Sequence, residues 1–567
     1  MLEKFLKQSS FSSYEDMIQN FKLEIPEHYN FAYDVVDGWA KEDPERIALY
    51  WTNPEGHEKK ISFAKMKEYS DRLSNALTSL GVGRDDVVAL ILKRRWEYWP
   101  SIIACHKIGA RALPINHLMK KKDLIYRFNM VECKAVIAVD EKMLIDEIEL
   151  AKDQCKYLKV KIMVDGEKDG WFNWNKIVDK ASPDWKRPFI NENSDVMLMY
   201  YTSGTTGLPK VVAHNHLYSL AHIITAKLWL NCEDGGLHLT VSDTGWGKAV
   251  WGKLYGQWIC GSTVFVYDYD RFVADDILNL FAKYKITTFC APPTIYRFFV
   301  KEDLSKYDFS SLHYVCTAGE ALHPEVFNVF EKQTGLKIYE GFGQTETVCM
   351  LATFPGVEPH PGSMGKPSPS YNVCLVDDDL MPVENGEEGH LVVDLGDVVS
   401  DDENCPKYKK FSNFPYGLFE SYIYESEFDK DKYKGKYYFT GDMAWRDEDG
   451  YYWFVGRSDD VIKTSGYRVG PFEIESVLME HPAVLECAIT GVPDPIRGQV
   501  VKATIVLTKD YSPSDELASR LKEYVKGNTA PYKYPRVIEF VKELPKTISG
   551  KIRRVDIREN KKENPDE

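Results

Sequence analysis

Hydrophobic residues follow two alternating patterns along the first part of the chain. Apolar runs at 47–51, 87–92 and 135–139 have the length of buried strands, and residues 63–80 and 98–108 have the spacing of amphipathic helices. Strands that alternate with helices in this way predict a sheet flanked by helices. We expect such a sheet in the first third of the chain.

The same alternation returns in the centre and then changes. Strand-like runs after residue 193 lie at 262–267, 286–290, 314–318 and 337–341. After Pro367 the pattern becomes strands and turns, which predicts a small β-rich subdomain up to Arg457. Residues 144–182 carry charged and aromatic side chains, and the segment WFNWNKI at 171–177 within them is interpreted as a surface excursion.

The last part of the chain has an alternation of its own. It predicts helices at 470–480 and 514–525 and strands at 485–492, 500–507 and 537–540. The predicted fold is therefore α/β, with a large N-terminal domain of two helix-flanked sheets and a small β-rich subdomain, residues 1–458. A smaller α+β domain, residues 459–567, is expected to follow.

Composition narrows the class of protein. The 567 residues are 44% hydrophobic and carry a formal net charge of −15, which argues against a nucleic-acid surface. Eleven cysteines without a Cys-x-x-Cys pair suit reduced thiols, and no apolar stretch is long enough for a signal peptide or a membrane span. We expect a cytoplasmic protein without a transmembrane segment, and the sequence leaves the oligomeric state open.

One stretch, VMLMYYTSGTTGLPK at 196–210, has the outline of an anion cradle. An apolar run precedes a turn whose glycines let the backbone approach a ligand, while hydroxyls and one lysine add donors and charge. The candidate phosphate-binding residues are Thr202, Ser203, Gly204, Thr205, Thr206, Gly207 and Lys210. A solvated Ser/Gly linker is the alternative, but linkers do not usually grow out of an apolar strand. The chain has no Walker A motif.

The segment TSGTTGLPK resembles the signature loop of the adenylate-forming superfamily of acyl-CoA synthetases, adenylation domains and luciferases. The surrounding residues look most like medium-chain acyl-CoA synthetases, from about Asp34 to Arg554. The resemblance implies an ATP-dependent carboxylic acid:CoA ligase that works through an acyl-adenylate. Its substrates would be the acid, ATP and coenzyme A, with Mg²⁺ as cofactor.

A second motif is YEGFGQTET at 339–347. A strand that runs into this segment would place a flat ring, a hydroxyl and a carboxylate around one nucleotide. The resemblance implies that Phe342 stacks on adenine, Thr345 donates to the α-phosphate and Glu346 holds Mg²⁺. It also extends the ATP site to Gly319, Glu320, Ala321, Glu340, Gly341, Gly343 and Gln344. The alternative is a strand end followed by a polar turn.

Two further motifs concern the ribose and the transfer step. Asp442 of FTGD suits the ribose because a carboxylate accepts two hydrogen bonds from vicinal hydroxyls, and Arg457 would lie beside it. The resemblance makes Asp459 the hinge of a mobile lid. It makes Lys551 of LPKTISGK the lysine that favours attack of a carboxylate on the α-phosphate. Taken alone, Lys551 would be an ordinary surface lysine.

The coenzyme A site rests on the resemblance alone. After the lid turns, Ser465, Gly466 and Tyr467 would close the site, and Gly466 would leave room for the pantetheine arm. Other matched positions are Arg468, Arg497, Tyr534, Pro535 and Arg536. Leu118 departs from the pattern, because the relatives carry a polar residue near that contact.

Gly343 is the most informative position for the acid. Acetyl-CoA synthetases carry a bulky Trp there, so the resemblance implies that glycine removes a wall of the acyl tunnel. Further walls are expected from Trp229, Trp246, Trp251 and Cys290, and Lys248 is either solvated or reaches into the site. A medium-chain or branched aliphatic acid is favoured, and an aromatic acid such as benzoate is the alternative.

Two other functions remain open at this point. The same adenylation chemistry would serve a carrier protein, although the chain has no appended carrier domain. A non-catalytic nucleotide-binding protein is the third reading. The presence of Lys210, Glu346, Asp442, Arg457 and Lys551 argues against it.

Overall fold

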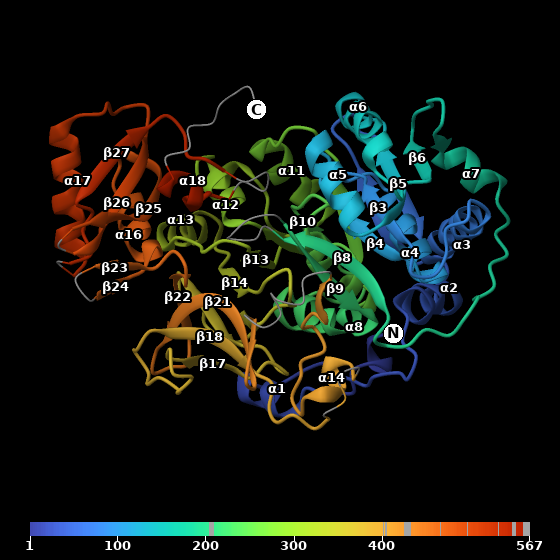
Figure 1. The fold of residues 1–567 in the computed structure, drawn as a ribbon, viewed down its shortest axis with the longest axis horizontal. Coiled ribbons are helices and arrows are strands. Elements are labelled where there is room, and N and C mark those ends of the chain that lie inside the picture. Colours follow the sequence, from blue (N-terminus) through green and yellow to red (C-terminus); the bar gives the residue numbers. More distant parts are fainter. Residues whose placement is uncertain are drawn as a thin grey trace.

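The computed structural model describes residues 1–202, 209–400, 402, 405–423, 432–464, 467–495, 497–530, 532–546 and 551–559. Its strands form three sheets, and helices pack around them (Figure 1). The elements near the C-terminus gather on the left of Figure 1, and those of the first sheet lie on the right. The predicted α/β class is confirmed, with a large N-terminal domain and a smaller C-terminal one.

The first sheet has eight strands in the order β19-β9-β8-β4-β3-β5-β6-β7. Their bounds are β3 Val87–Ile91, β4 Arg111–Pro114, β5 Cys133–Val139, β6 Val160–Val164, β7 Phe172–Asn173, β8 Val196–Thr202, β9 Lys210–Asn215 and β19 Ser421–Ile423. Strands β3 to β8 run parallel to their neighbours, whereas β9 returns antiparallel to β8. The two runs predicted at 87–92 and 135–139 are the adjacent strands β3 and β5.

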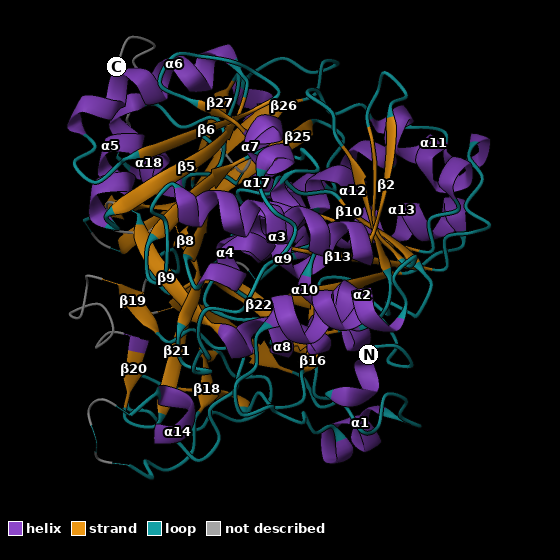
Figure 2. Cartoon of the chain, turned by 90° about the vertical axis from the view of Figure 1, so that its right-hand side faces the viewer, coloured by secondary structure: helices purple, strands orange, loops and turns teal. Residues whose placement is uncertain are grey.

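Helices cover both faces of this sheet, as the alternation of apolar residues requires. Val136 belongs to a core with Phe128 of α5, whereas Ile137 belongs to a core with Trp174 of α7. Figure 2 accordingly shows α5 and α7 on either side of β5 and β6. The helices in this part are α1 Tyr14–Asn20, α2 Gly38–Glu42, α3 Phe63–Ser79, α4 Tyr98–Ile108, α5 Lys121–Met130, α6 Lys142–Ala151 and α7 Trp174–Lys180, with a π-helix at Ala32–Asp37.

The second sheet has fourteen strands, and its central strands are parallel. The bounds are β1 Ile47–Thr52, β2 Glu58–Ser62, β10 Leu237–Thr240, β11 Thr263–Tyr267, β12 Thr288–Ala291, β13 Tyr314–Ala318, β14 Ile338–Phe342, β15 Leu351–Ala352, β16 Ser363–Pro367, β17 Val373–Val376, β18 Gly389–Asp394, β20 Tyr433–Lys434, β21 Tyr437–Arg446 and β22 Tyr452–Arg457. The β-rich stretch after Pro367 is not a separate sheet. It continues the second sheet through β14, β15 and β16.

The helices of this half of the N-terminal domain lie between successive strands. They are α8 His216–Ile223, α9 Gly247–Gly252, α10 Tyr255–Ile259, α11 Ala274–Tyr284, α12 Pro293–Phe299, α13 Pro324–Thr334 and α14 Lys407–Lys410, with a π-helix at Ile224–Trp229. In the part of the chain that the structure describes, none of the helices combines the length and apolarity needed to cross a bilayer.

The third sheet belongs to the smaller C-terminal domain and has five strands. They are β23 Ile462–Thr464, β24 Tyr467–Val469, β25 Val484–Asp494, β26 Gly498–Leu507 and β27 Val537–Val541, and the helices are α16 Pro471–Met479, α17 Asp515–Asn528 and α18 Arg554–Arg558. Ile474 of α16, Leu521 of α17 and Ile489 of β25 share one buried core. The predicted helices and strands of this region are confirmed.

Two parts of the chain differ from the sequence expectation. Residues 171–177, expected to be a surface excursion, form β7 and the first half of α7. Trp174 is 1% exposed and its Nε1 donates to Ser101 Oγ at 3.2 Å, because the short helix α7 buries one face against α3. The second difference is β9, which the sequence reading did not contain. It turns the segment after the phosphate loop into the second arm of a hairpin.

Candidate active site

The candidate residues gather where the parallel strands of the second sheet end. Cys290 is the next-to-last residue of β12, Gly319 follows β13, and Gly343 follows β14. The loop 241–246 follows β10 at the same edge. Ligands of open α/β sheets bind outside the carboxyl ends of the strands, so this edge is the expected position of a site.

The nucleotide turn joins the first sheet to this edge. Thr202 at the end of β8 and Lys210 at the start of β9 are paired residues of one hairpin. Lys210 Nζ lies 5.4 Å from the ring centroid of Tyr422 on β19. The predicted donors Ser203, Gly204, Thr205, Thr206 and Gly207 lie outside the described residues.

The Thr345–Glu346 segment is held by bonds from the neighbouring elements. Tyr422 Oη donates to Glu346 Oε1 at 2.5 Å, and the Phe419 amide donates to the Glu346 carbonyl at 2.8 Å. His214 Nε2 lies 2.8 Å from the Thr345 carbonyl oxygen. Glu346 is only 6% exposed, so its carboxylate has a fixed orientation. Tyr422 and His214 were missed from the sequence, because no motif marks them.

The ribose candidate Asp442 lies beside Arg457, as the sequence reading predicts. The two residues are register partners on β21 and β22, with Arg457 Nη1 3.4 Å from Asp442 Oδ1. Gln344 Nε2 donates to Asp442 Oδ2 at 2.7 Å. Burial raises the pKa of Asp442, and the charge of Arg457 opposes this shift. Asp442 is therefore a buried acceptor that its neighbours orient.

Lys432 is a further cation of this site that the sequence reading missed. Its Nζ donates to the Thr440 carbonyl at 2.8 Å, and Gln344 Nε2 donates to the same oxygen at 2.9 Å. Burial lowers the pKa of Lys432, and the charges of Glu346 and Asp442 oppose this shift. Lys432 lies ten residues before Asp442, outside every recognised motif, so only the fold places it here.

The segment expected to line the adenine has one open backbone position. Gly319 has φ of +106°, and a Cβ there would have no heavy atom within 4 Å. By contrast, the side chain of Glu320 pairs with Arg297 at 2.9 Å. Glu340 is 6% exposed, and burial raises its pKa to about 8. The side chain of Glu340 points into the interior, so it contributes to the edge through its backbone.

Gly343 lies against Trp251, and both residues belong to the predicted acyl pocket. A Cβ on Gly343 would lie 2.4 Å from Trp251 Cη2 and 2.6 Å from the Val348 carbonyl oxygen. The indole of Trp251 on α9 thus lies directly beside Gly343. In the same way, a Cβ on Gly341 would lie 2.5 Å from Trp229 Cε2.

The two indoles form one surface. Trp229 and Trp251 meet edge to face, with centroids 6.1 Å apart and planes at 87°. Trp229 Nε1 donates to the Tyr339 carbonyl at 3.2 Å, which ties this surface to β14. Trp246 is partly exposed and immediately precedes α9.

Lys248 points inward, which decides between the two readings of this residue. Its Nζ donates to the Ala318 carbonyl at 2.6 Å. Burial lowers the pKa of Lys248. The charge of Lys551 adds to this shift, whereas Cys290 and Glu320 oppose it. Lys248 therefore lies between the acyl surface and the end of β13.

The C-terminal domain brings Lys551 within electrostatic range of this edge. The charge of Lys551 opposes the burial that raises the pKa of Asp442, and it adds to the burial that lowers the pKa of Lys248. At the predicted hinge, Asp459 Oδ1 lies 3.7 Å from Arg457 Nε. Arg558 Nη1 donates to the Asp459 carbonyl at 3.1 Å.

The predicted coenzyme A residues share one end of the third sheet. Tyr467 on β24 stacks on Tyr532 with centroids 4.2 Å apart, and Arg497 precedes Gly498, which pairs with Thr464. Tyr534 lies 5.0 Å from the Arg536 guanidinium, with Pro535 between them in the chain. Ser465 and Gly466 lie outside the described residues, and Arg468 is a residue of β24.

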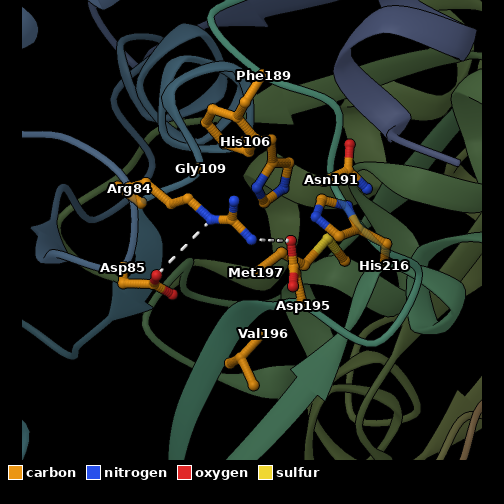
Figure 3. A pocket seen from close by; sticks show the side chains of 11 residues that line it. Arg84, Asp85, His106, Gly109, Phe189, Asn191, Asp195, Val196, Met197 and His216 are labelled. Carbon is orange, nitrogen blue, oxygen red and sulfur yellow. Dashed lines mark hydrogen bonds and ion pairs between the residues drawn. The ribbon is translucent and has the colours of Figure 1, made fainter. Parts of the chain in front are cut away.

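A separate enclosed cavity lies between α4, α8 and the start of β8 (Figure 3). Its volume of about 10 Å³ accommodates one water molecule. The imidazoles of His106 and His216 face it, and both Nδ1 atoms are buried without a hydrogen-bond partner among the described residues. The cavity is too small for a nucleotide or an acid, so it is distinct from the candidate active site.

The fold and the site together define an enzyme of the nucleotide-binding α/β class with a smaller C-terminal domain. The chain belongs to the AMP-binding enzyme family: residues 36–399 match the model of the AMP-binding enzyme, and residues 473–551 match the model of the AMP-binding enzyme C-terminal domain. The likeness to adenylate-forming acyl-CoA synthetases seen in the sequence is thereby confirmed.

Relatives extend over nearly the whole chain. The mitochondrial acyl-coenzyme A synthetase ACSM3 of Homo sapiens is 40% identical over 97% of this chain and 92% of its own length. The mitochondrial acyl-coenzyme A synthetase ACSM5 of Homo sapiens is 40% identical over 94% of this chain and 91% of its own length. These relatives, which are named as mitochondrial, overturn the cytoplasmic expectation, because reduced cysteines do not distinguish the cytosol from other reducing compartments.

Solved structures of similar fold are also known. The anthranilate CoA ligase AuaEII in complex with anthranoyl-AMP is 30% identical with a TM-score of 0.83, covering 94% of this chain and 98% of the other. A benzoate CoA ligase from Burkholderia xenovorans is 26% identical with a TM-score of 0.79, covering 94% of this chain and all of the other (100%).

Proposed function

We propose that this protein is an ATP-dependent carboxylic acid:CoA ligase that forms acyl-CoA, AMP and pyrophosphate through an acyl-adenylate. The observation that carries the proposal is the meeting of Glu346, the Asp442–Arg457 pair and the charge of Lys551 at one sheet edge. The relatives named acyl-coenzyme A synthetases support the same activity.

ATP would bind across the two sheets. The phosphates would lie on the turn between Thr202 and Lys210, the ribose hydroxyls would donate to Asp442, and Phe342 would stack on the adenine. Lys432 would add positive charge beside them. The residues present also fit Mg²⁺, because this ion is usually held by one or two carboxylates together with substrate phosphates, and Glu346 is a buried, oriented carboxylate. When bound, Mg²⁺ would neutralise part of the phosphate charge.

In the first step, a carboxylate oxygen of the acid attacks the α-phosphorus. A new O–P bond forms, the bond from the α-phosphorus to the bridging oxygen breaks, and its electron pair leaves with pyrophosphate. Both reactants are anionic, so a cation that bridges their oxygens favours the transition state. Lys551 is the cation suited to this role, because its charge already acts on Asp442 and Lys248 at the edge. Thr345 would donate to the α-phosphate.

In the second step, the thiolate of coenzyme A attacks the acyl carbonyl carbon and AMP leaves with the electron pair of the C–O bond. We assign residues 1–458 to the body and residues 459–567 to a lid that turns about Asp459 between the steps. The turn would bring Ser465, Gly466 and Tyr467 to the site. Arg468, Arg497 and the Tyr534–Arg536 segment would hold coenzyme A.

The acid would be a medium-chain or a branched short-chain aliphatic acid. The crossed indoles of Trp229 and Trp251 narrow the space next to β14, which disfavours a long straight chain. Indole faces also pack against flat rings, and two similar structures are ligases for anthranilate and benzoate. An aryl acid is therefore the second candidate substrate.

The test is an acid panel measured in two assays. Acids of two to twelve carbons, branched acids and benzoate are supplied with ATP, first for pyrophosphate exchange and then for thioester formation with coenzyme A. We expect both signals for the same subset of acids. Exchange without thioester would favour loading of a carrier protein, and the absence of exchange with every acid would favour a non-catalytic nucleotide-binding protein.

A further inference from the structure

The Thr345–Glu346 segment follows the second sheet, but two of its polar contacts come from strands of the first sheet. His214 is on β9 and Tyr422 is on β19, which pair in register: Tyr422 is opposite Val212, and Ser421 is opposite Ala213. The two side chains reach the segment from this shared edge, one to the Thr345 carbonyl and one to the Glu346 carboxylate.

Tyr422 has the geometry of a strong donor to Glu346. A hydroxyl that donates to a carboxylate at 2.5 Å is a charge-assisted hydrogen bond, which is shorter and stronger than a neutral one. Tyr422 is 4% exposed and Glu346 is 6% exposed, so water does not compete well for either group. The bond fixes Oε1, and with it the direction in which the carboxylate faces the site.

His214 contacts Thr345 through an imidazole ring that is in a defined tautomer. Its ring is fully buried and stacks on Tyr218 with centroids 3.7 Å apart. Burial lowers the pKa of His214 to about 3, so the ring is neutral at physiological pH. The contact at 2.8 Å joins Nε2 to a carbonyl oxygen, and a carbonyl only accepts, so the single ring proton is on Nε2.

The same edge also carries the nucleotide turn. Lys210 begins β9, four residues before His214, and its Nζ lies 5.4 Å from the Tyr422 ring centroid. A shift of β19 against β9 would therefore move the Glu346 contact and the Lys210 surroundings together. The paired strands β9 and β19 therefore connect the turn at Lys210 with the Thr345–Glu346 segment, and the proposed function assigns both to the phosphates.

We infer that Tyr422 and His214 are positioning residues, which hold Glu346 and Thr345 in the orientation that binding of the magnesium complex of ATP requires. The inference rests on the proposed function, since it assigns support to residues whose roles that function defines. Neither residue belongs to a motif recognised in the sequence, and both act through a neighbour instead of touching the substrate.

Tyr422→Phe is the direct test, because it removes one hydroxyl and keeps the ring. ATP affinity is measured by equilibrium fluorescence titration in the absence of acid, once with Mg²⁺ and once with EDTA. We expect affinity in EDTA to stay within about twofold of the unchanged protein, and the tightening by Mg²⁺ to fall by about tenfold, as expected for loss of one hydrogen bond to a charged group. The Mg²⁺ concentration for half-maximal pyrophosphate exchange should rise by a similar factor.

Tyr452→Phe is the matched control. Tyr452 is 1% exposed, and its hydroxyl donates to the Val373 carbonyl at 3.0 Å, away from Thr345 and Glu346. We expect a comparable loss of thermal stability and unchanged Mg²⁺ dependence. If Tyr422→Phe matches Tyr452→Phe in both titrations, the positioning role of Tyr422 is overturned.

Glu346→Gln separates this inference from the proposed function. If Glu346→Gln loses Mg²⁺ dependence while Tyr422→Phe keeps it, the inference is wrong and the function stands. If Glu346→Gln also keeps the Mg²⁺ dependence, the metal role of Glu346 and the inference are both wrong.

His214 gives an independent arm if Tyr422→Phe does not fold. His214→Leu should raise the KM for ATP in pyrophosphate exchange about tenfold with little change in kcat, and His214→Gln, which retains an N–H donor, should restore part of the lost affinity. Equal loss in both variants would contradict the role of the Nε2 contact.

Discussion

The body and the lid contribute to the proposed site in opposite ways. On the body, Asp442 is 4% exposed and Glu346 is 6% exposed, and each is fixed by hydrogen bonds to its neighbours. On the lid, Tyr467 is 53% exposed, and the side chain of Lys551 is also exposed. This difference agrees with the proposed function, in which the body would bind the nucleotide in advance and the lid would supply groups that single steps require.

The largest effect is expected from Lys551→Ala. If the lid acts in the transfer step alone, adenylate formation should fall by about 10²–10³-fold while ATP affinity changes little, because the lost charge acts mainly on the transition state. Single-turnover adenylation and equilibrium ATP titration measure the two quantities. Thioester formation from a supplied acyl-adenylate should remain. An equal loss in both half-reactions would break the division between body and lid.

Asp442→Ala is the reciprocal change on the body. It removes the acceptor proposed for the ribose and leaves the Gln344 amide and the Arg457 guanidinium without this partner, so ATP affinity should fall by about 30–100-fold. Titration with ATP and with pyrophosphate alone is the measurement, since pyrophosphate lacks the ribose. Comparable weakening of both ligands would contradict the ribose assignment.

Trp251→Ala tests whether the wall of the acyl region comes from α9. Removing the indole beside Gly343 should raise kcat/KM for acids two to four carbons longer than the best natural one by about tenfold relative to that acid. A stability loss of about 3–5 kcal/mol is also expected for a buried tryptophan. Trp174→Ala is the control, because Trp174 is also buried but belongs to α7, which packs against α3. The same acid profile in both variants would mean that Trp251 is not part of the acyl wall.

The last prediction concerns the free energy of unfolding at acidic pH, which buried groups of the body should determine. Burial lowers to about 3 the pKa of five histidines of the body, namely His106, His214, His216, His238 and His323.

In the unfolded chain a histidine has a pKa near 6.5, so below this pH the unfolded state binds more protons and stability falls as pH decreases. Buried carboxyls act in the opposite direction: burial raises the pKa values of Glu97 and Glu340 to about 8, and it also raises the pKa of Glu420. Urea unfolding should show a loss of at most about 1.4 kcal/mol per histidine per pH unit below 6.5. A flat profile between pH 6.5 and 5 would contradict this.

The sequence predicted the parallel strands and the C-terminal domain well because their apolar runs are long and periodic. It missed β9, since the six residues KVVAHN follow a glycine turn that by itself suits an open loop. It predicted the β-rich strands after Pro367, but local pattern does not reveal that β15 and β16 join them to the parallel strands in one sheet.

The candidate site was predicted only as far as motifs reach. Asp442 and Arg457 lie together as expected, because adjacent antiparallel strands carry them. Tyr422, His214 and Lys432 depend on contacts between segments far apart in the chain, and no local pattern marks them. Gly343 illustrates the same limit: the sequence places Trp251 in the same predicted pocket, but only the fold shows that its indole lies directly beside the glycine.

The pairing of β19 with β9 has a consequence for synthesis. Residues 421–423 complete an edge whose other strand is at 210–215, so the two arms are made far apart in time. A chain that is still emerging from the ribosome has no finished phosphate site until residue 423 has left the exit tunnel. Until then, the β9 edge presents unpaired backbone groups to the solvent, which makes this strand a natural place for a chaperone to bind the growing polypeptide.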